Sequence, residues 1–432
     1  MKKKLSKESA LKFLVVIIFF FQIVWNYGVI FFGNNNKIEQ SIISSGLVLI
    51  IGSIYSVYSY RRNILAVILH IMLAYFNYSV VVSVCWNLNN LHSIFNGYTY
   101  DEQLNGISIV LVFWCSYIVT IQTNIGFDRL AFKRQSGSNE IFVFGCVVYT
   151  FCAPFLFYSS AEFGERGGGS PLYEYTIIII LVGIYFTGRR KKNLIALGAA
   201  STFFSLHGLL YGERVSALQI TIIWGIYLLL DRLDVKTIMI ACVGGVVGLT
   251  VVGMVRGISA WHSGAIKEAV DILLEERLAN STSYFAYQSG LSIYRLEFEV
   301  PLINRLIQFG AFVFYIFLGS IVPNSNLSVI ASEYNHNWGG GWLPFYCHFW
   351  FGIIGVIFMA VFVGKIVQMA CSPCMGSYYK NYLRLYVIAT VPRWYLYSPS
   401  AICRGILIFT VLFFVLNLMD RQLKKRFGYM RE

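Results

Sequence analysis

The chain begins with MKKKLSKESALKFLVVIIFFFQIVW (residues 1–25), a short basic segment followed by a long apolar run. The run approaches the ~20 residues that an α-helix needs to cross the hydrocarbon core of a bilayer. No small-residue cleavage site follows it, so we interpret it as a first membrane helix rather than a signal peptide. Similar runs recur along all 432 residues, of which 57% are hydrophobic and 13% charged. This composition is too apolar for a soluble protein and predicts an all-α polytopic membrane protein.

The apolar runs predict about twelve transmembrane helices. They cover residues 10–32, 41–59, 64–86, 105–123, 140–160, 173–188, 193–211, 216–230, 237–255, 346–370, 382–398 and 405–419. Each run is continuous rather than alternating between polar and apolar residues. A transmembrane β-barrel is therefore disfavoured.

Short basic clusters between the runs predict the orientation of the chain. They are Lys2–Lys4, Arg61 with Arg62, Arg129 with Lys133 and Arg134, Arg189–Lys192 and the tail RQLKKRFGYMRE (421–432). If the spans alternate, these clusters share one side, which the positive-inside rule makes the cytoplasm. The net charge of +13 is explained by these clusters and indicates no nucleic-acid partner. We therefore expect both termini in the cytoplasm.

One apolar run, LIQFGAFVFYIFLGSIV (306–322), breaks the alternation, because counting it as a full crossing would export the basic tail. We expect it to be re-entrant, to lie along the interface, or to pair with a second crossing within 256–305. The predicted organisation is an N-terminal bundle of about nine spans (1–255), a large outward-facing region (256–345) and a C-terminal bundle with its basic tail (346–432).

The stretch LHGLLYGERVSALQITIIW (206–224) carries Glu213 and Arg214 between two apolar runs. A charge this close to hydrocarbon usually faces a bundle interior or a wet cavity, although the tip of a solvated hairpin is the alternative. Further arginines are predicted at matching depth on the same side, and they are Arg256, Arg393 and Arg404. The planar guanidinium suits phosphate oxygens, so this group predicts a phosphate or carboxylate ligand.

A second candidate element is EYNHNWGGGWLPFY (333–346). Glu333 and His336 are candidates for the general base, since histidine titrates near neutral pH and burial raises a carboxylate towards it. Trp338 and Trp342 are candidates for stacking on sugar faces, and the glycines 339–341 allow close approach of a ligand. The alternative is an interfacial loop with an aromatic belt.

The sequence holds no pattern that predicts a metal or a cofactor. It has no HExxH motif, no paired carboxylates of the kind that bind a metal–nucleotide complex, and no clustered Cys and His ligands. Most of the 9 cysteines lie within apolar runs, where they are interpreted as small packing residues.

The chain resembles the Wzy-type oligosaccharide repeat-unit polymerases of bacterial O-antigen and capsule assembly. By architecture the resemblance covers most of the chain. It rests on GERVSALQ (212–219), on GGGWLPFYCHFWFGIIGVIF (339–358) and on the element that carries Arg393 and Arg404. Arg214 and Gly225 also fit an Arg-x10-Gly spacing described in some members.

The resemblance implies a protein of the bacterial inner membrane whose active site is periplasmic. The implied reaction transfers a growing glycan from undecaprenyl pyrophosphate to the non-reducing-end sugar of a new lipid-linked repeat unit. A diphosphate leaving group needs preorganised donors, so we expect Arg214, Arg393 and Arg404 to bind it. Arg256 is expected as a fourth ligand, and Glu213 is expected to orient Arg214 or the acceptor.

Three other functions remain open from the sequence, and they are an O-antigen ligase, a lipid-linked oligosaccharide flippase or transporter, and a non-catalytic scaffold of the polysaccharide machine. An O-antigen ligase would use the same donor with a lipid A-core acceptor, and a lipid-linked oligosaccharide flippase or transporter would catalyse no transfer. A transporter is expected to have paired repeats or broken helices around a midplane site, and neither is evident. The expected partners are lipid-linked oligosaccharides, the bilayer and a chain-length regulator protein.

Overall fold

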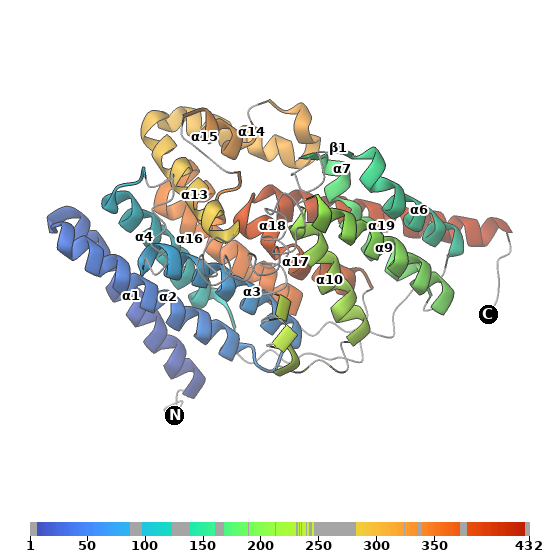
Figure 1. Cartoon of the computed structure of the whole chain (residues 1–432), viewed down its shortest axis with the longest axis horizontal. Coiled ribbons are helices and arrows are strands. Elements are labelled where there is room, and N and C mark those ends of the chain that lie inside the picture. Colours follow the sequence, from blue (N-terminus) through green and yellow to red (C-terminus); the bar gives the residue numbers. More distant parts are fainter. Residues whose placement is uncertain are drawn as a thin grey trace, which may run out of the picture. The chain divides into compact units, whose positions relative to one another are not determined.

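In the residues that it describes, the structure, a computed structural model, is almost entirely helical, with one pair of two-residue strands (Figure 1). It describes residues 7–86, 97–122, 139–159, 168–188, 190–211, 213–229, 232, 234, 236–238, 240–241, 244–245, 282–323, 325–334, 339–371 and 378–427. The chain divides into two compact units. Unit 1 comprises Met1–Phe127, Val270–Ser372 and Val391–Ala401, and unit 2 comprises Asp128–Ala269, Pro373–Thr390 and Ile402–Glu432.

Unit 1 is built from helices of the first and last thirds of the chain. Its helices are α1 (Lys7–Phe32), α2 (Asn35–Ser59), α3 (Ile64–Val80) with a π-helical turn (Val81–Cys85), α4 (Tyr100–Thr120), α13 (Thr282–Glu299), α14 (Leu302–Leu318) with a 3-10 turn (Gly319–Ile321), α15 (Leu327–Tyr334), α16 (Leu343–Cys371) and α18 (Val391–Leu396). The predicted boundaries at 255 and 345 therefore do not follow the packing. The reason is that α13 and α16 bury their surfaces against α3 and α4 rather than forming separate domains.

Unit 2 contains the middle of the chain and its C-terminal helix. Its elements are α6 (Glu140–Leu156), β1 (Tyr158–Ser159), β2 (Gly168–Gly169), α7 (Pro171–Glu174), α8 (Thr176–Phe186), α9 (Lys191–Leu210), α10 (Arg214–Leu229), α17 (Tyr378–Ala389) and most of α19 (Ser400–Phe427). The two strands pair antiparallel, with Tyr158 opposite Gly169.

Among the described residues, eight helices are long and apolar enough to cross a membrane. They are Lys7–Phe32, Asn35–Ser59, Ile64–Cys85, Tyr100–Thr120, Lys191–Leu210, Leu302–Ile321, Leu343–Cys371 and Ser400–Arg426. The predicted all-α, multi-pass membrane protein is confirmed to this extent. Seven of the eight coincide with predicted spans, and the other coincides with the exceptional segment 306–322.

The remaining predicted spans have different outcomes. Three correspond to shorter apolar helices, Glu140–Leu156, Pro171–Phe186 and Arg214–Leu229. The span predicted at 382–398 is instead divided at Thr390 into α17 and α18, because Pro392 starts a new helical segment there. The span predicted at 237–255 falls mostly outside the described residues.

A buried polar network joins three helices of unit 1, α1, α2 and α4, which lie side by side (Figure 1). Asn26 donates from Nδ2 to the hydroxyl oxygens of Ser45 at 2.9 Å and Ser108 at 3.0 Å. Its Oδ1 accepts from Ser41 at 2.7 Å. Interhelical hydrogen bonds of this kind supplement van der Waals packing, since lipid provides no hydrophobic drive for helix association.

The predicted alternation of spans agrees with the way helix ends meet in unit 1. Lys12, in the second turn of α1, donates from Nζ to the carbonyl oxygens of Val119 and Ile121, each at 2.8 Å. Gln368, near the end of α16, donates to the carbonyl oxygen of Thr120 at 2.6 Å. The start of α1 and the ends of α4 and α16 therefore share one end of unit 1.

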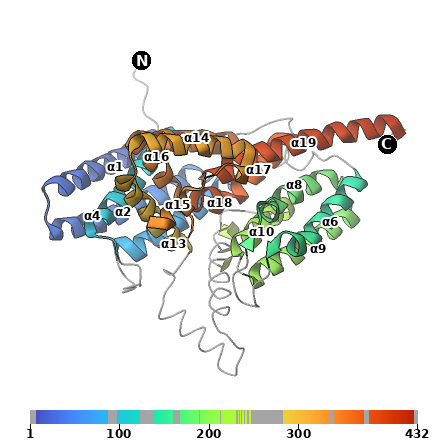
Figure 2. The same cartoon turned by 90° about the horizontal axis from the view of Figure 1, so that it is seen from above.

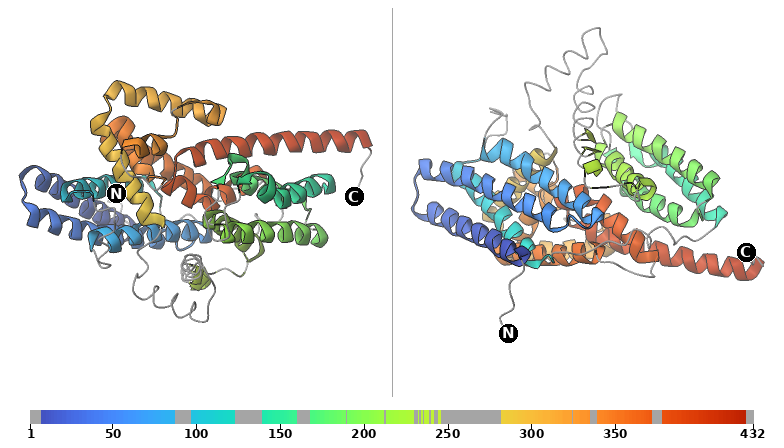
Figure 3. Two further views of the ribbon diagram at one scale, coloured as in Figure 1. Left: turned by 45° about the horizontal axis from the view of Figure 1, so that its top comes forward. Right: turned by 90° about the horizontal axis from the view of Figure 1, so that it is seen from below.

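Helix α13 runs steeply across the direction of α1 and α2 (Figure 3). Ser283, near its start, accepts from the indole of Trp342 at the start of α16. Arg295, near its end, forms an ion pair with Glu102 in the first turn of α4. Trp342 also contacts Tyr395, whose hydroxyl accepts from the indole of Trp114 in the second half of α4. Helix α13 therefore extends from the first turn of α4 into the interior of the unit.

Helix α14, which contains most of the segment 306–322, packs on α16 at residues 349–351 (Figure 2). Its side facing the protein buries Gln308 and Phe312, whereas Ile303, Ile307 and Phe314 are more than 60% exposed. The helix therefore presents an apolar outer face, as expected of a helix in contact with lipid, and its inner side contacts α16 through aromatic rings and Gln308. Helix α14 with its 3-10 turn is itself long and apolar enough to cross a membrane, so the three arrangements of this segment stay predictions.

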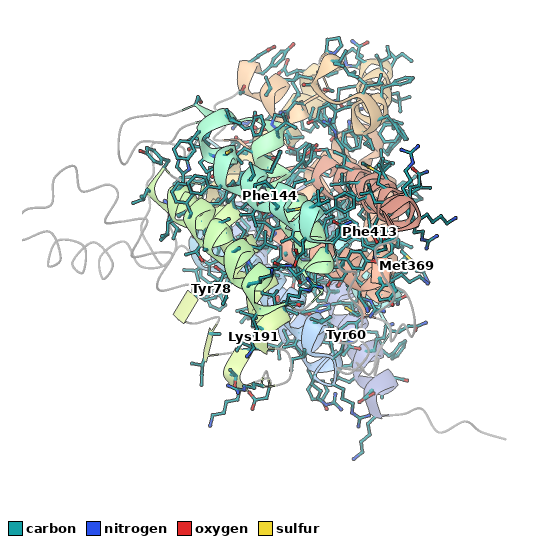
Figure 4. All side chains as sticks on the ribbon, turned by 90° about the vertical axis from the view of Figure 1, so that its right-hand side faces the viewer. Tyr60, Tyr78, Phe144, Lys191, Met369 and Phe413 are labelled. Carbon is teal, nitrogen blue, oxygen red and sulfur yellow. The ribbon has the colours of Figure 1, made fainter. Side chains whose placement is uncertain are left out.

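Unit 2 is stabilised by an aromatic cluster between α8, α17 and α19. Tyr185 contacts the rings of Tyr378, Tyr382 and Phe413, with centroid distances of 4.8 to 5.8 Å. Phe413 is buried in this cluster and is labelled in Figure 4. The hydroxyl of Tyr185 donates to Asn417 Oδ1 at 2.8 Å, which satisfies its polar group within the apolar surroundings.

Candidate functional site

The predicted pair Glu213–Arg214 lies at the turn between α9 and α10 in unit 2. Glu213 is 7% exposed, and Arg214 is the half-buried first residue of α10. The turn is tight because Gly208 lacks a side chain, and a Cβ there would lie 3.1 Å from the carbonyl oxygen of Glu213. The same Cβ would lie 3.4 Å from the hydroxyl of Tyr173. Glu213 is therefore buried at a turn that lies close to Tyr173 of α7, rather than extending as a hairpin tip into solvent.

A group of aromatic side chains surrounds this turn. The hydroxyl of Tyr158 in β1 donates to the carbonyl oxygen of Tyr211 at 2.7 Å. The imidazole of His207 lies 4.6 Å from the ring of Tyr211 and 5.1 Å from that of Tyr158, centroid to centroid. Tyr173 stacks on Phe204 with centroids 4.5 Å apart. These contacts order the short β1–β2 pair and the α9–α10 turn as one structure.

Arg404 of α19 belongs to the same unit. Its guanidinium carbon lies 5.6 Å from the centroid of the Tyr175 ring, which is within cation–π distance. Tyr175 follows α7 directly, and α7 supplies the Tyr173 that contacts the turn of Glu213. Arg404 and the turn that carries Glu213 thus both lie close to the one segment 171–175. No local sequence pattern indicates this shared segment, because it lies about 40 residues from Glu213 and about 230 residues from Arg404.

Arg393 belongs to unit 1, where it is half-buried in α18. Its guanidinium carbon lies 5.7 Å from the centroid of the Tyr397 ring. Its carbonyl oxygen accepts from the backbone nitrogens of Tyr397 at 3.1 Å and Ser398 at 3.2 Å, which ends the helix. Arg393 therefore lies at a helix end, as the kinking proline at 392 predicts.

The glycine run 339–341 packs against the end of α18. All three glycines have positive φ, of 88°, 84° and 138°. Gly341 N donates to the carbonyl oxygen of Leu396 at 3.0 Å, and Tyr346 donates from its hydroxyl to the carbonyl oxygen of Tyr397 at 2.5 Å. Only glycine adopts such a run without strain. The structure therefore brings the glycine loop of the second candidate element to the end of the Arg393 helix.

The structure corrects the expectation for Trp342. This side chain is completely buried, and its Nε1 donates to the carbonyl oxygen of Ser283 at 3.1 Å. Its ring also contacts those of Tyr287 and Tyr395. A ring enclosed by three helices has no face available for a sugar, so Trp342 is a packing residue that joins α13 to α16.

The remaining predicted site residues are either exposed or outside the described residues. Glu333 is an exposed residue of α15, one position before its last residue. His336, Trp338 and Arg256 fall outside the described residues. Within the described ranges, no three His, Cys, Asp or Glu side chains are grouped so that they could hold a metal ion.

Three residues that the sequence analysis did not predict form a charged cluster in unit 1. Glu297 of α13 accepts from Arg305 Nη1 at 2.6 Å through Oε1 and lies 2.7 Å from His348 Nδ1 through Oε2. Their side chains are between 14% and 17% exposed. The available signal was a histidine within the apolar run of α16, since an ionisable residue in such a run is by default a functional candidate.

Tyr294 borders this cluster, with its ring centroid 5.9 Å from that of His348. Burial raises the pKa of Tyr294 to about 12, and the carboxylate of Glu297 adds to the effect. The phenol is therefore neutral over the physiological range. The cluster consists of one carboxylate, one guanidinium, one imidazole and a neutral phenol.

The helix that carries His348 is broken four residues later. Gly352 has φ 60° and ψ −151°, so α16 consists of a short first piece and a longer second piece. The break removes the ordinary helical donor for nearby carbonyl oxygens, and Arg305 Nη1 donates to that of Phe349 at 3.2 Å. Irregular backbone at membrane depth occurs where it is buried in protein or lines a cavity. Here the guanidinium of Arg305 satisfies the carbonyl oxygen of Phe349 next to the break.

Comparisons with known protein families, with curated proteins and with solved structures found no match to this chain. A functional conclusion therefore rests on the chain's own residues and on the resemblance of its sequence pattern.

Proposed function

We propose that the chain is a metal-independent glycosyltransferase that polymerises undecaprenyl-pyrophosphate-linked oligosaccharide repeat units. The growing glycan leaves its lipid diphosphate and joins the non-reducing-end sugar of a new lipid-linked unit. Because both substrates are anchored in the outer leaflet, the proposed active site is on the periplasmic face of a bacterial inner membrane. The proposal includes about twelve crossings, an outward region at 256–345 and cytoplasmic termini.

The observation that best supports this proposal is the position of Arg214 at the first residue of α10, directly after the buried Glu213. Helix N-termini attract anions through their backbone N–H groups and the helix dipole. A guanidinium at that position adds a planar donor that matches phosphate oxygens. The buried carboxylate beside it provides a group that orients the guanidinium, which is the role proposed for Glu213.

The proposed binding roles follow from this chemistry. Arg214 and Arg404, which belong to the same unit, are proposed to stabilise the diphosphate as the glycosidic bond breaks, and Arg393 is proposed as a further guanidinium donor. Arg404 and Arg393 each lie over a tyrosine ring, which holds a guanidinium in position without neutralising its charge. Preorganised donors contribute most in a site that excludes water. Arg256 is retained as a fourth ligand in the proposal.

The proposal is tested by the glycan that cells make when Arg214 is replaced. In a strain whose own polymerase gene is deleted, the wild-type chain is expected to produce long ladders and Arg214→Ala only single repeat units on the lipid A-core. Arg214→Lys serves as the matched control, because it keeps the charge and removes the planar fork. Normal ladders from Arg214→Ala at normal protein level would remove Arg214 from the site. Loss of all repeat units from the core in the absence of the chain would instead identify a ligase.

A further inference from the structure

We propose that His348 is the general base of this reaction and takes the proton from the acceptor hydroxyl, with Glu297 and Arg305 as positioning residues. This inference rests on the proposed function and assigns a role that the sequence placed on Glu333 or His336. It is carried by the cluster in which three helices of unit 1, α13, α14 and α16, bring these side chains together.

The hydrogen bond between His348 and Glu297 fixes the tautomer of the imidazole. An ionised carboxylate only accepts hydrogen bonds, so the proton of neutral His348 resides on Nδ1, 2.7 Å from Glu297 Oε2. The lone pair of the ring is then on Nε2. The described residues offer Nε2 no hydrogen-bond partner. An imidazole held through one nitrogen by a carboxylate, with the other nitrogen open, is the arrangement that general base catalysis requires.

Arg305 keeps this arrangement in place from α14. It pairs with the second oxygen of the Glu297 carboxylate and bridges to the carbonyl oxygen of Phe349, one residue after His348. The guanidinium thereby balances the charge of a carboxylate that is only 17% exposed, which would otherwise be costly to bury. It also ties Glu297 to the helix piece that carries His348. Loss of Arg305 is therefore expected to displace the imidazole of His348 while leaving its Nε2 able to accept a proton.

The location of the cluster agrees with a lipid-linked substrate. His348 lies in the first piece of the broken α16, and Arg305 lies in the first turn of α14, whose outer face is apolar and exposed. Ionisable residues and irregular backbone at membrane depth are both costly, and they persist together at functional sites. Ile303 and Leu306 flank Arg305 on the exposed side of α14, so a polyprenyl chain lying there would hold its polar head near the cluster.

The acceptor oxygen forms a bond to the anomeric carbon of the donor glycan while the bond from that carbon to the diphosphate oxygen breaks. The lipid diphosphate leaves with the electron pair. The proton of the acceptor hydroxyl moves to Nε2 of His348 and is then released to water. No oxidant, reductant or metal is needed.

The test uses the purified full-length chain in lipid nanodiscs with synthetic lipid-linked repeat units. His348→Asn keeps an N–H near the position of Nδ1 for Glu297 but cannot take a proton. We expect its kcat to fall by about 10²- to 10⁴-fold with KM nearly unchanged. Added imidazole is expected to restore part of the rate in His348→Ala. The acidic limb of the pH–rate profile, where a protonated imidazole stops the reaction, is expected to disappear in both variants.

Positioning is tested separately, with a control on the same helix. Glu297→Gln is expected to lower kcat and shift the acidic limb, and Arg305→Lys is expected to retain more activity than Arg305→Ala. Glu299→Gln changes an exposed carboxylate two residues away and is expected to behave as wild type. Wild-type rates and an unchanged pH profile in His348→Asn, from a wild-type chain that does polymerise, would overturn the role of His348 alone. A folded wild-type chain that makes no polymer would overturn the proposed function, and this inference with it.

Discussion

Asn63 donates a hydrogen bond from Nδ2 to the carbonyl oxygen of Cys371 at 2.6 Å, across 308 residues of sequence. Its Oδ1 accepts from Ala66 N at 3.2 Å and so caps the start of α3. One buried side chain therefore joins the beginning of α3 to the end of α16. The turn that carries Arg61 and Arg62 accordingly lies at the end of unit 1 where α16 finishes, as the predicted alternation of spans requires.

The orientation of unit 1 can be tested with single cysteines in a cysteine-free background. We expect Glu333→Cys to react with a membrane-impermeant maleimide in intact spheroplasts, because Glu333 is exposed in the region predicted to face outwards. Arg62→Cys, at the basic turn, is expected to react only after permeabilisation, since the positive-inside rule places it in the cytoplasm. Reaction of both cysteines from the same side would contradict the topology.

The membrane helices could be predicted from the sequence because length and apolarity are local properties. The run 346–370, for example, corresponds to α16 at Leu343–Cys371. The break at Gly352 could not be predicted, since GIIG reads as ordinary apolar helix and the positive φ depends on what surrounds it. The sequence alone marks the segment 306–322 as exceptional, because counting it as a full crossing would place the basic C-terminal tail outside. The position of this segment on α16 depends on Arg305 and Gln308 meeting groups more than 40 residues away, which a local pattern does not contain.

The polar network of Asn26 is expected to stabilise unit 1. Asn26→Ala removes bonds to three serines, two of which keep bonds to backbone carbonyls of their own helices. We therefore expect a moderate loss of about 1–2 kcal/mol in the free energy of unfolding, measured in detergent by thermal or denaturant titration. Phe21→Leu, at an exposed site of the same helix, is the matched control and should change stability by less than about 0.5 kcal/mol. Equal effects from the two variants would contradict a structural role for the network.

The glycine loop offers a sharper packing test. A Cβ at Gly341 would lie 2.5 Å from Ile293 Cδ1, whereas nothing lies within 4 Å of one at Gly339. Both alanine variants suffer backbone strain of about 1–2 kcal/mol from positive φ. Gly341→Ala is expected to lose a further ~1–3 kcal/mol through overpacking.

Ile293→Val removes the clashing methyl group and provides the control for this argument. A double-mutant cycle should show that Gly341→Ala costs less when residue 293 is valine, and that Gly339→Ala is unaffected by the change. The measurement is the free energy of unfolding of the four proteins in each cycle. Strict additivity for the pair at 341 and 293 would contradict the packing described here.

Trp342 distinguishes a packing role from a sugar-binding role. Trp342→Phe removes the donor to Ser283 and part of a buried ring, so we expect a loss of at least about 1 kcal/mol in the free energy of unfolding. The KM for the lipid-linked acceptor is expected to stay within twofold of wild type. A large rise in KM without loss of stability would favour the stacking role that the sequence suggested.

The candidate site was less predictable than the fold, and particular residues show why. Trp342 follows three glycines in a polar stretch, which favours an exposed loop, but the loop folds back on α18 and buries the ring. His348 lies in a run that reads as membrane helix, and its partners Glu297 and Arg305 are 51 and 43 residues earlier. The sequence predicts Arg214, Arg393 and Arg404 as site residues because charged side chains next to apolar runs are rare. The tyrosines that contact Arg393 and Arg404 could not be predicted, since the chain has 29 tyrosines and no local pattern selects among them.

The most direct measurement of the central claim uses purified protein reconstituted alone in nanodiscs. Synthetic undecaprenyl-pyrophosphate-linked repeat units are added, and the length of the product is followed over time. The wild-type chain is predicted to build ladders and release one lipid diphosphate for each bond formed, and Arg214→Ala is predicted to slow this by about 10²- to 10³-fold. A folded wild-type chain that leaves every repeat unit single, under conditions in which a known polymerase elongates them, would contradict the account.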